Sequence, residues 1–309
     1  MDNKLLKIKK KDSEELKLIK EKEKIYKKIE KHKAWLENKL SNKTKQNFSK
    51  IIFKNMDLTK VDFSFTSLVG AEFHNCILNK NCFINSDLSA CSFFSSPIEN
   101  ATFHSVVLID VDFSNSIIND SSFKNCTMAD VDFSGGNFKK CIFRDCQISN
   151  SNFCGSELYD INFLENNLKK VFFSSAKLTS VAFWRCNIEE SFFSNTCFQS
   201  CFFKQTVLKK TNFWKAVLID TSFRNSELPL DPNITRFNSV DKNFCQHMMY
   251  MAWKTMQVCS DPEIKTFFES NNDFNKIAKD FEETNLFREI KDAVYPSEIK
   301  TTPEKGNSK

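Results

Sequence analysis

Large apolar residues recur at every fifth position from Phe53 to Leu228, without one insertion. These two residues are 175 positions apart, which gives 36 central positions at this spacing. Central residues whose number ends in 3 are all phenylalanine, and those whose number ends in 8 are mostly leucine, isoleucine or methionine. Two residues before each centre stands a residue that is usually small or β-branched. A fixed period of this kind is the signature of a repeat architecture.

A period of five matches neither the 3.6-residue period of an α-helix nor the two-residue period of a strand. A solenoid with four five-residue sides satisfies it, because each side turns one large and one small side chain inward. Twenty residues then complete a coil, residue n lies above residue n − 20, and the 36 units make nine coils. At about 4.8 Å per coil, the rod is about 43 Å long.

Many units place a small or branched residue and then Asp, Asn or Glu before the central phenylalanine, as in Val61-Asp62-Phe63, Ala71-Glu72-Phe73 and Thr211-Asn212-Phe213. This pattern resembles that of the pentapeptide-repeat proteins, over residues 51–228. The resemblance implies a mainly β fold, a right-handed quadrilateral β-helix. It says little about function, because one scaffold can carry many different sites.

We predict four parts for the chain. Residues 1–47 form a basic helical arm that caps the first coil, and residues 48–230 form the β-helix. Residues 231–296 form a C-terminal helical cap module, since Pro229 and Pro232 end the five-residue register. Residues 297–309 form a disordered tail. Caps are expected because the open end of a β-solenoid exposes an unpaired strand edge.

The first fifty residues carry seventeen lysines against eight acidic residues, a net charge of +9. Ser13 is a candidate N-terminal cap for a helix here, followed by Glu14 and Glu15. A cap over the first coil, a short coiled coil and an arm that binds a partner or an anionic surface all remain open. The thin apolar stripe of this helix, with Trp35 beside it, consists of Ile19, Tyr26, Ile29, Leu36 and Leu40.

Most of the twelve cysteines have a structural explanation. Because no Cys-x-x-Cys pair exists, a zinc site is not expected, nor is any other cofactor. Cys126 and Cys146 lie one coil apart and could approach disulfide distance, but we predict reduced thiols. Seven cysteines occupy the inward small position, where cysteine behaves as a small apolar residue: Cys76, Cys91, Cys126, Cys141, Cys146, Cys186 and Cys201.

Outward charge is uneven along the repeat region. Residues 51–138 hold four lysines and ten acidic residues, and residues 139–228 hold twelve basic and eight acidic residues. The resemblance raises one known activity, because some quinolone-resistance proteins of the family are thought to imitate DNA and engage gyrase or topoisomerase IV. A 43 Å imitation of DNA would need about 25 negative charges. The repeat region has a net charge of −2, so we keep DNA mimicry as an alternative.

Stacking at twenty-residue intervals groups some charges. The pairs Lys169-Lys170, Glu189-Glu190 and Lys209-Lys210 form an alternating ladder, which indicates a structural role. Four aspartates instead form an acidic patch in which like charges stack. Either Asp112 and Asp132 bond to the nearby backbone, or the patch attracts a cation or a basic partner such as the arm. The patch consists of Asp110, Asp112, Asp130 and Asp132.

Outward aromatic residues gather on the last coils, and the tail contains a methionine-rich helical pattern. These side chains either cover an interface with the C-terminal module or form a protein-binding surface, which aromatic residues favour. The candidate binding residues are Phe172, Trp184, Phe192, Phe202, Trp214, Met248, Met249 and Met251.

The four histidines lie near no cysteine or serine in an arrangement that suggests a nucleophile and a base. We therefore predict a non-enzymatic protein–protein interaction scaffold, with the role of a bacterial effector-type binding module open. The alternative is a DNA mimic that binds and protects gyrase or topoisomerase IV. The expected partner is a protein, without direct nucleic-acid binding, and a homodimer through the C-terminal module is possible. No membrane span or secretory signal is recognised, so we expect a cytoplasmic protein or one secreted into a host cell without a classical signal peptide.

Overall fold

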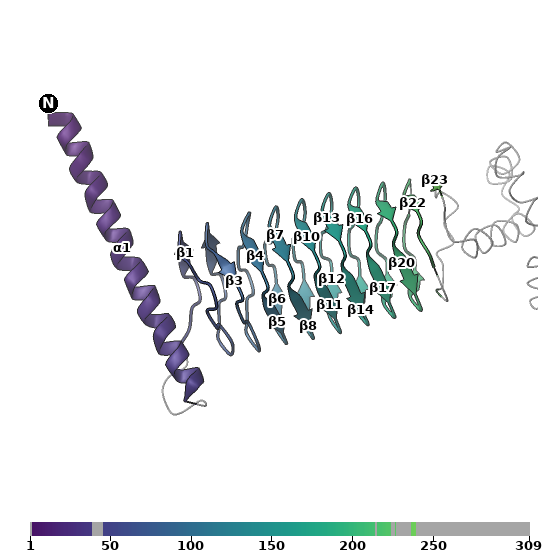
Figure 1. The fold of residues 1–309 in the computed structure, drawn as a ribbon, viewed down its shortest axis with the longest axis horizontal. Helices are drawn as coiled ribbons and strands as arrows, with labels where there is room; N and C mark the ends of the chain where they lie inside the picture. Colours follow the sequence, from purple (N-terminus) through teal and green to yellow (C-terminus); the bar gives the residue numbers. More distant parts are fainter. Residues whose placement is uncertain (1, 39–45, 214, 224–225, 227–235, 239–309) are drawn as a thin grey trace, which may run out of the picture. The chain divides into compact units, whose positions relative to one another are not determined.

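The computed structural model describes residues 2–38, 46–213, 215–223, 226 and 236–238. Helix α1 (Asp2–Glu37) is followed by short parallel strands that stack coil upon coil (Figure 1). The chain divides into two compact units, Met1–Val240 and Asp241–Lys309, and the second lies outside the described residues. The predicted C-terminal helical module (231–296) and tail, with Met248, Met249 and Met251, lie outside the described residues as well, except residues 236–238, which form a strand paired with the coils rather than a helix.

The strands form four faces of the solenoid, and we name each face after one outward residue. The Trp184 face is a six-stranded sheet and the Lys169 face is another. The Trp184 face contains β5 (Thr102–His104), β8 (Ser122–Lys124), β11 (Ile142–Arg144), β14 (Asn162–Leu164), β17 (Ala182–Trp184) and β20 (Phe202–Lys204). The Lys169 face contains β6 (Val107–Ile109), β9 (Thr127–Ala129), β12 (Gln147–Ser149), β15 (Asn167–Lys169), β18 (Asn187–Glu189) and β21 (Val207–Lys209).

The other two faces differ in how regular their strands are. The Tyr159 face is a nine-stranded sheet, whereas the Asp132 face has two named strands and continues as isolated bridges. The Tyr159 face contains β3 (Leu78–Asn79), β4 (Pro97–Glu99), β7 (Ile117–Asn119), β10 (Asn137–Lys139), β13 (Glu157–Tyr159), β16 (Lys177–Thr179), β19 (Cys197–Gln199), β22 (Val217–Ile219) and β23 (Arg236–Asn238). The Asp132 face contains β1 (Ile52–Lys54), β2 (Glu72–His74) and the bridges that join Ser92, Asp112, Asp132, Asn152, Phe172, Phe192 and Asn212 in series.

The register confirms the predicted twenty-residue coil. Phe143 pairs with Phe123 on one side and with Phe163 on the other, and Asp112 pairs with Asp132. Inside, the phenylalanines form two stacks of nine, one from Phe53 to Phe213 and one from Phe63 to Phe223. Successive rings lie nearly parallel, as for Phe123 and Phe143 at 4.7 Å. Rings of different stacks meet edge to face, and the phenylalanines are buried, so the core is closely packed.

Each side of the coil ends in a residue with left-handed backbone. All 35 positions from Lys50 to Asp220 at five-residue intervals have φ between 48° and 67°. Seventeen of them are Asn, Asp or Gly, which tolerate this conformation best, and none is β-branched. The residue preference at the fifth position therefore reflects the turn at every corner rather than contact with a ligand.

Many of the inward small residues also form a hydrogen bond to the backbone of the coil below. Their side chains donate to the carbonyl oxygen of the central residue 23 positions earlier, as Cys186 does to Phe163 (3.2 Å) and Ser86 to Phe63. Asn166 makes the same bond to Phe143 (2.7 Å), and its own oxygen accepts from the Cys146 amide. A polar hydrogen is therefore useful at this position, which explains the frequency of Cys, Ser, Thr and Asn there.

All ten described cysteines are free thiols, and the seven predicted to point inward are buried. Burial raises the pKa of the Cys91 and Cys186 thiols to about 12, and that of Cys141 and Cys201 to about 11. These thiols therefore stay protonated at neutral pH and can act as donors.

Helix α1 packs on the first coil through its C-terminal half. The Nε2 atom of His32 is 3.0 Å from the Ser64 carbonyl oxygen, and the imidazole stacks on Trp35 and meets the edge of Phe48 at 5.6 Å. Closer to the N-terminus of the helix, Lys22 donates to the Asn55 carbonyl oxygen and Tyr26 donates to the Asp57 carbonyl oxygen. The helix thus covers the inner phenylalanine of the first coil.

The prediction that a helix begins at Ser13 was wrong. Helix α1 runs through that position from Asp2, because residues 2–12 contain no proline or glycine and are rich in Leu, Ile and Lys. The apolar stripe was only partly correct. Ile29 and Trp35 are buried, but Ile19 and Tyr26 are exposed, and Leu40 lies outside the described residues. Between Glu14 and Glu37 the most buried residue is His32, which the sequence did not single out.

Gly136 should be intolerant of any side chain because of Phe138, an aromatic residue in a column whose other members, apart from Phe198, are aliphatic. A Cβ atom on Gly136 would lie 2.7 Å from the Phe138 ring and 3.2 Å from the Phe133 carbonyl oxygen. We expect Gly136→Ala to destabilise the solenoid by about 1–3 kcal/mol through overpacking. Thermal unfolding followed by circular dichroism measures this. In a Phe138→Leu background the penalty should largely disappear, and an undiminished penalty would contradict this explanation.

His32→Ala should loosen helix α1 from the first coil. The substitution removes the contacts of a side chain that is 1 % exposed, and a loss of about 1.4 kcal/mol raises the open population tenfold. Limited trypsin digestion should therefore cut the lysine-rich helix roughly ten times faster. His104→Ala, on the outside of the solenoid, is the control and should leave the cleavage rate unchanged. Equal rates in wild type and His32→Ala would show that the imidazole does not hold the helix.

Candidate interaction surface

The side chain of Trp184 is held in a defined position on the outer surface of β17. Its indole Nε1 donates to Gln205 Oε1 (3.2 Å), which also accepts from Arg185 Nε. The Arg185 guanidinium lies over the indole at 5.4 Å and the Lys204 ammonium at 5.2 Å. Trp184 nevertheless remains 41 % exposed, and Phe202 on the next coil is 48 % exposed. A fixed, exposed aromatic side chain flanked by cations suits contact with another protein.

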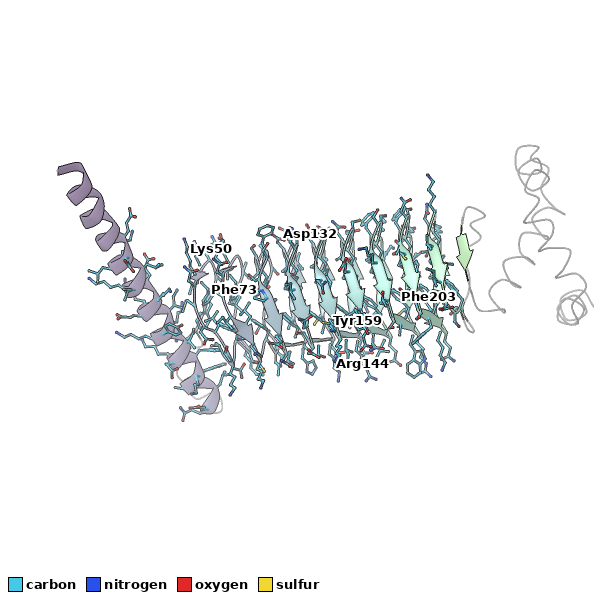
Figure 2. All side chains as sticks on the ribbon, turned by 45° about the horizontal axis from the view of Figure 1, so that its top comes forward. Lys50, Phe73, Asp132, Arg144, Tyr159 and Phe203 are labelled. Atoms are coloured by element: carbon cyan, nitrogen blue, oxygen red, sulfur yellow. The ribbon has the colours of Figure 1, made fainter. Side chains whose placement is uncertain are left out.

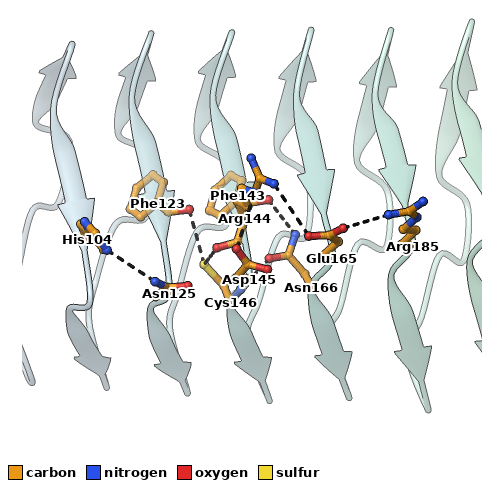
Figure 3. Close-up of polar contacts among 10 residues, drawn as sticks. All are labelled: His104, Phe123, Asn125, Phe143, Arg144, Asp145, Cys146, Glu165, Asn166 and Arg185. Atoms are coloured by element: carbon orange, nitrogen blue, oxygen red, sulfur yellow. Dashed lines mark hydrogen bonds and ion pairs between the residues drawn. The ribbon is translucent and has the colours of Figure 1, made fainter.

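Ion pairs extend this arrangement down the rod, as Figure 3 shows. Glu165 bridges two coils, with one oxygen 3.3 Å from Arg185 Nη1 and the other 3.9 Å from Arg144 Nη2. Arg144 also lies 3.5 Å from Asp145 on its own corner. Exposed pairs of this kind contribute little stability, so their main effect is to fix the orientation of the charged side chains.

The late aromatic residues do not form one cluster. Phe172 and Phe192 stack in parallel at 5.2 Å on the Asp132 face, whereas Trp184 and Phe202 lie on the Trp184 face. Residues ten positions apart stand half a coil apart, so these two faces are opposite each other. The described aromatic residues are exposed as predicted, and Trp214 lies outside the described residues.

The four aspartates of the acidic patch lie on adjacent coils as predicted. Asp112 accepts hydrogen bonds from the amide and hydroxyl of Ser114, and Asp132 accepts from the amide of Ser134 and from Asn152. Asp110 and Asp130 occupy left-handed corner positions. Each aspartate therefore has a local structural role. Their charges still face outward, because Asp110 and Asp130 are exposed and Asp112 and Asp132 are half-buried.

The predicted lysine–glutamate ladder forms on the Lys169 face. Glu190 lies 4.0 Å from Lys170 and 3.4 Å from Lys210, and Glu189 lies 3.5 Å from Lys209. The Tyr159 face carries a similar pair, in which Lys177 donates to Glu157 at 2.9 Å. This hydrogen bond and the lysine charge lower the pKa of Glu157. The charges of these residues are thus paired with opposite charges one coil away.

Sequence reasoning missed the basic residues around Trp184. Arg144, Arg185 and Lys204 lie at positions that twenty-residue spacing aligns with Trp184 or with its corner, so the signal was present in the register. Among the described residues, no group of three His, Cys, Asp or Glu side chains could hold a metal ion. Within that same part of the chain, no helix is long and apolar enough to cross a membrane.

Comparison with known proteins agrees with this geometry. A family model described as a pentapeptide repeat region matches residues 96–173 and 116–193. A second, described as pentapeptide repeats (8 copies), matches residues 46–93 and 186–225. A search of the curated proteins found no match.

Solved structures with similar coils include pentapeptide-repeat proteins of low sequence identity. HetL from the cyanobacterium Nostoc, involved in heterocyst differentiation regulation, is 15% identical, with 62% of this chain and 89% of HetL covered and a TM-score of 0.30. Full-length QnrB1, a plasmid-mediated fluoroquinolone resistance protein, is 17% identical, with 65% and 96% covered and a TM-score of 0.35. At these identities and TM-scores the matches carry no argument about function.

The family assignment therefore rests on the two family models, which match the same residues that form the stacked coils. Together they span almost all of residues 46–225, more than half of the 309 residues. The chain belongs to the pentapeptide-repeat family.

Proposed function

We propose that this protein is a non-enzymatic interaction module that binds a protein through the outer surface of its late coils. The observation that carries the proposal is Trp184, an exposed indole fixed by Gln205 and flanked by Arg185 and Lys204. Tryptophan and arginine are the residues that most often dominate binding energy at protein interfaces. Phe202, one coil farther along, adds exposed apolar area to the same face.

The chemistry of the described residues supports a binding role. Burial raises the pKa of the Cys91, Cys141, Cys186 and Cys201 thiols, so these four offer no reactive thiolate at neutral pH. The outward carboxylates of Glu157, Glu165 and Glu190 are engaged in ion pairs with lysine or arginine. An effector-type role in a host cell is compatible with such a surface, and its partner would be a host protein.

DNA mimicry remains the second hypothesis, but the charge distribution favours it less. The aspartates that would form its acidic face are confined to two adjacent coils, and Asn152 and Phe172 continue the same column. A continuous acidic strip would need about one negative charge per 1.7 Å of rod. Protection of gyrase in a supercoiling assay with a quinolone, lost in Asp112→Asn/Asp132→Asn, would favour this hypothesis over our proposal.

The Trp184→Ala/Phe202→Ala variant should lose its protein partner while the fold stays intact. Removing two exposed aromatic side chains at an interface costs about 2 kcal/mol or more, so binding should fall at least tenfold. Pulldown from bacterial and host-cell lysates, with quantification of the bound partner, measures this loss. Circular dichroism verifies that the coils are unchanged.

Ile117→Ala/Tyr159→Ala is the matched control, because both side chains are exposed but lie on the Tyr159 face. It should retain the partner. The proposal fails if wild type captures no protein, or if a captured protein binds the Trp184→Ala/Phe202→Ala variant as strongly as wild type.

A further inference from the structure

The Trp184 face and the Asp132 face carry complementary side chains at the same levels of the rod. Figure 2 shows Arg144 and Asp132 at opposite edges of the coils. One outward column of the Trp184 face, aligned by strand register, reads His104, Lys124, Arg144, Leu164, Trp184 and Lys204. The bridged column of the Asp132 face reads Ser92, Asp112, Asp132, Asn152, Phe172, Phe192 and Asn212. Basic residues on one face are level with acidic ones on the other, and aromatic residues are level with aromatic ones.

We propose that copies of this chain associate side by side, parallel and without stagger, with the Trp184 face of one copy against the Asp132 face of the next. The inference rests on the proposed function, since it names a second copy as a protein that the late coils bind. In two translated copies the Lys169 faces point the same way. The column that begins at His104 therefore meets the column that begins at Ser92, and not the outward column on the far side of the Asp132 face.

The rise of the coil gives the height of each residue along the rod axis, so the heights of facing residues can be compared. Twenty residues rise about 4.8 Å, so one residue rises about 0.24 Å. Lys124 is twelve residues after Asp112 and eight before Asp132, which places it about 2.9 Å above the one and about 1.9 Å below the other. Trp184 falls in the same way between Phe172 and Phe192, the stacked pair. The contact would thus join lysine to aspartate and indole to phenylalanine.

The neighbouring corner columns also match. In this arrangement Glu165 of one copy is level with Lys170 of the next, and Arg185 is level with Glu190, each about 1.2 Å apart along the axis. The other level pairs contain at most one charge, so no like charges oppose each other at the same level. These pairs are Asn125 with Asp130, Asp145 with Asn150, and Gln205 with Lys210.

The remaining columns permit close approach. Opposite the exposed Ile142 and Phe202 of one copy, the Asp132 face of the next presents a column of small side chains. From residue 114 to residue 194 this column consists of Ser114, Ser134, Cys154, Ser174 and Ser194, with the exposed Phe94 one coil earlier. A solenoid of equal coil spacing can match such columns at every coil. An extended peptide cannot, because its side chains on one face repeat at about 6.6 Å.

The contact would be small. About six coils give a strip roughly 29 Å long, and a face about 10–12 Å wide then buries roughly 300–350 Å² on each copy. Stable interfaces bury about 1,200–2,000 Å² in total, so this association should be weak and dependent on concentration. Because two different faces meet, the contact is heterologous, and copies add in an open row. Its ion pairs make it weaker at high salt.

Sedimentation velocity of the full chain tests the proposal. Wild type should form dimers and larger species as its concentration rises, and these should dissociate when salt is raised. Asp112→Asn/Asp132→Asn removes the two charges but keeps a side-chain oxygen that can accept from the amides of Ser114 and Ser134. Asn152 accepts from the Cys154 amide in the same way. We expect this variant to associate at least tenfold more weakly. Lys139→Glu on the Tyr159 face is the control and should associate like wild type.

Charge reversal gives the decisive comparison. Lys124→Glu/Arg144→Glu and Asp112→Lys/Asp132→Lys should each be monomeric, since like charges then face each other. An equimolar mixture should associate again, because the reversed faces complement one another. Phe172 and Phe192 stand in the same column as Asp112 without a carboxylate, so the fold should accept the lysines. Circular dichroism checks this for each variant.

Three results would overturn the proposal: wild type that stays monomeric at high concentration and low salt, association that survives both reversals, or a mixture that stays monomeric. The outcome is separate from that of the proposed function. If self-association is absent but a lysate protein is still lost in Trp184→Ala/Phe202→Ala, only the inference about a second copy fails. If neither is observed, both fail.

Discussion

The constraint on which the rest of this protein depends is the closure of each coil in twenty residues. Backbone hydrogen bonds then join each coil to the next, as between the Phe133 amide and the Asn152 carbonyl oxygen. This register stacks phenylalanine on phenylalanine without a break, and aliphatic on aliphatic except where Phe138 and Phe198 stand in an aliphatic column. It also aligns outward side chains in columns. A charged or aromatic residue at every twentieth position therefore forms a continuous charged or aromatic column on the surface. Core and surface are thus set by the same spacing but by different residues within each five.

Within that frame, the small residues of the repeat follow from hydrogen bonding as much as from volume. A thiol, hydroxyl or amide at the inward small position donates to a carbonyl 23 residues earlier, and Asn, Asp and Gly recur where the corner has left-handed backbone. The many cysteines and the acidic patch, which invite a chemical interpretation, therefore have structural reasons. The outward aromatic and basic side chains of the late coils have no such structural explanation, and we propose that they carry the function.

The sequence predicted the coil, the buried residues and the exposed aromatic residues, because a strict period converts residue number directly into position. It did not predict where helix α1 begins or that His32 is buried against the first coil, since these depend on packing rather than on a period. It also grouped Phe172 with Trp184, although half a coil separates them. The twenty-residue register would have placed them on opposite faces, but the residues were grouped by distance along the chain instead of by face.

The most direct test of the account is the thermal stability of chains shortened by whole coils and by single sides. Deleting residues 136–155 removes twenty positions and keeps every column aligned, so the melting temperature should fall only slightly. Deleting residues 141–145 removes one side and places Ile148 over Phe123, which breaks the phenylalanine stacks beyond that point. We expect this shorter deletion to lower the melting temperature far more than the longer one. Equal stability of the two deletions would contradict the claim that the twenty-residue register holds the fold together.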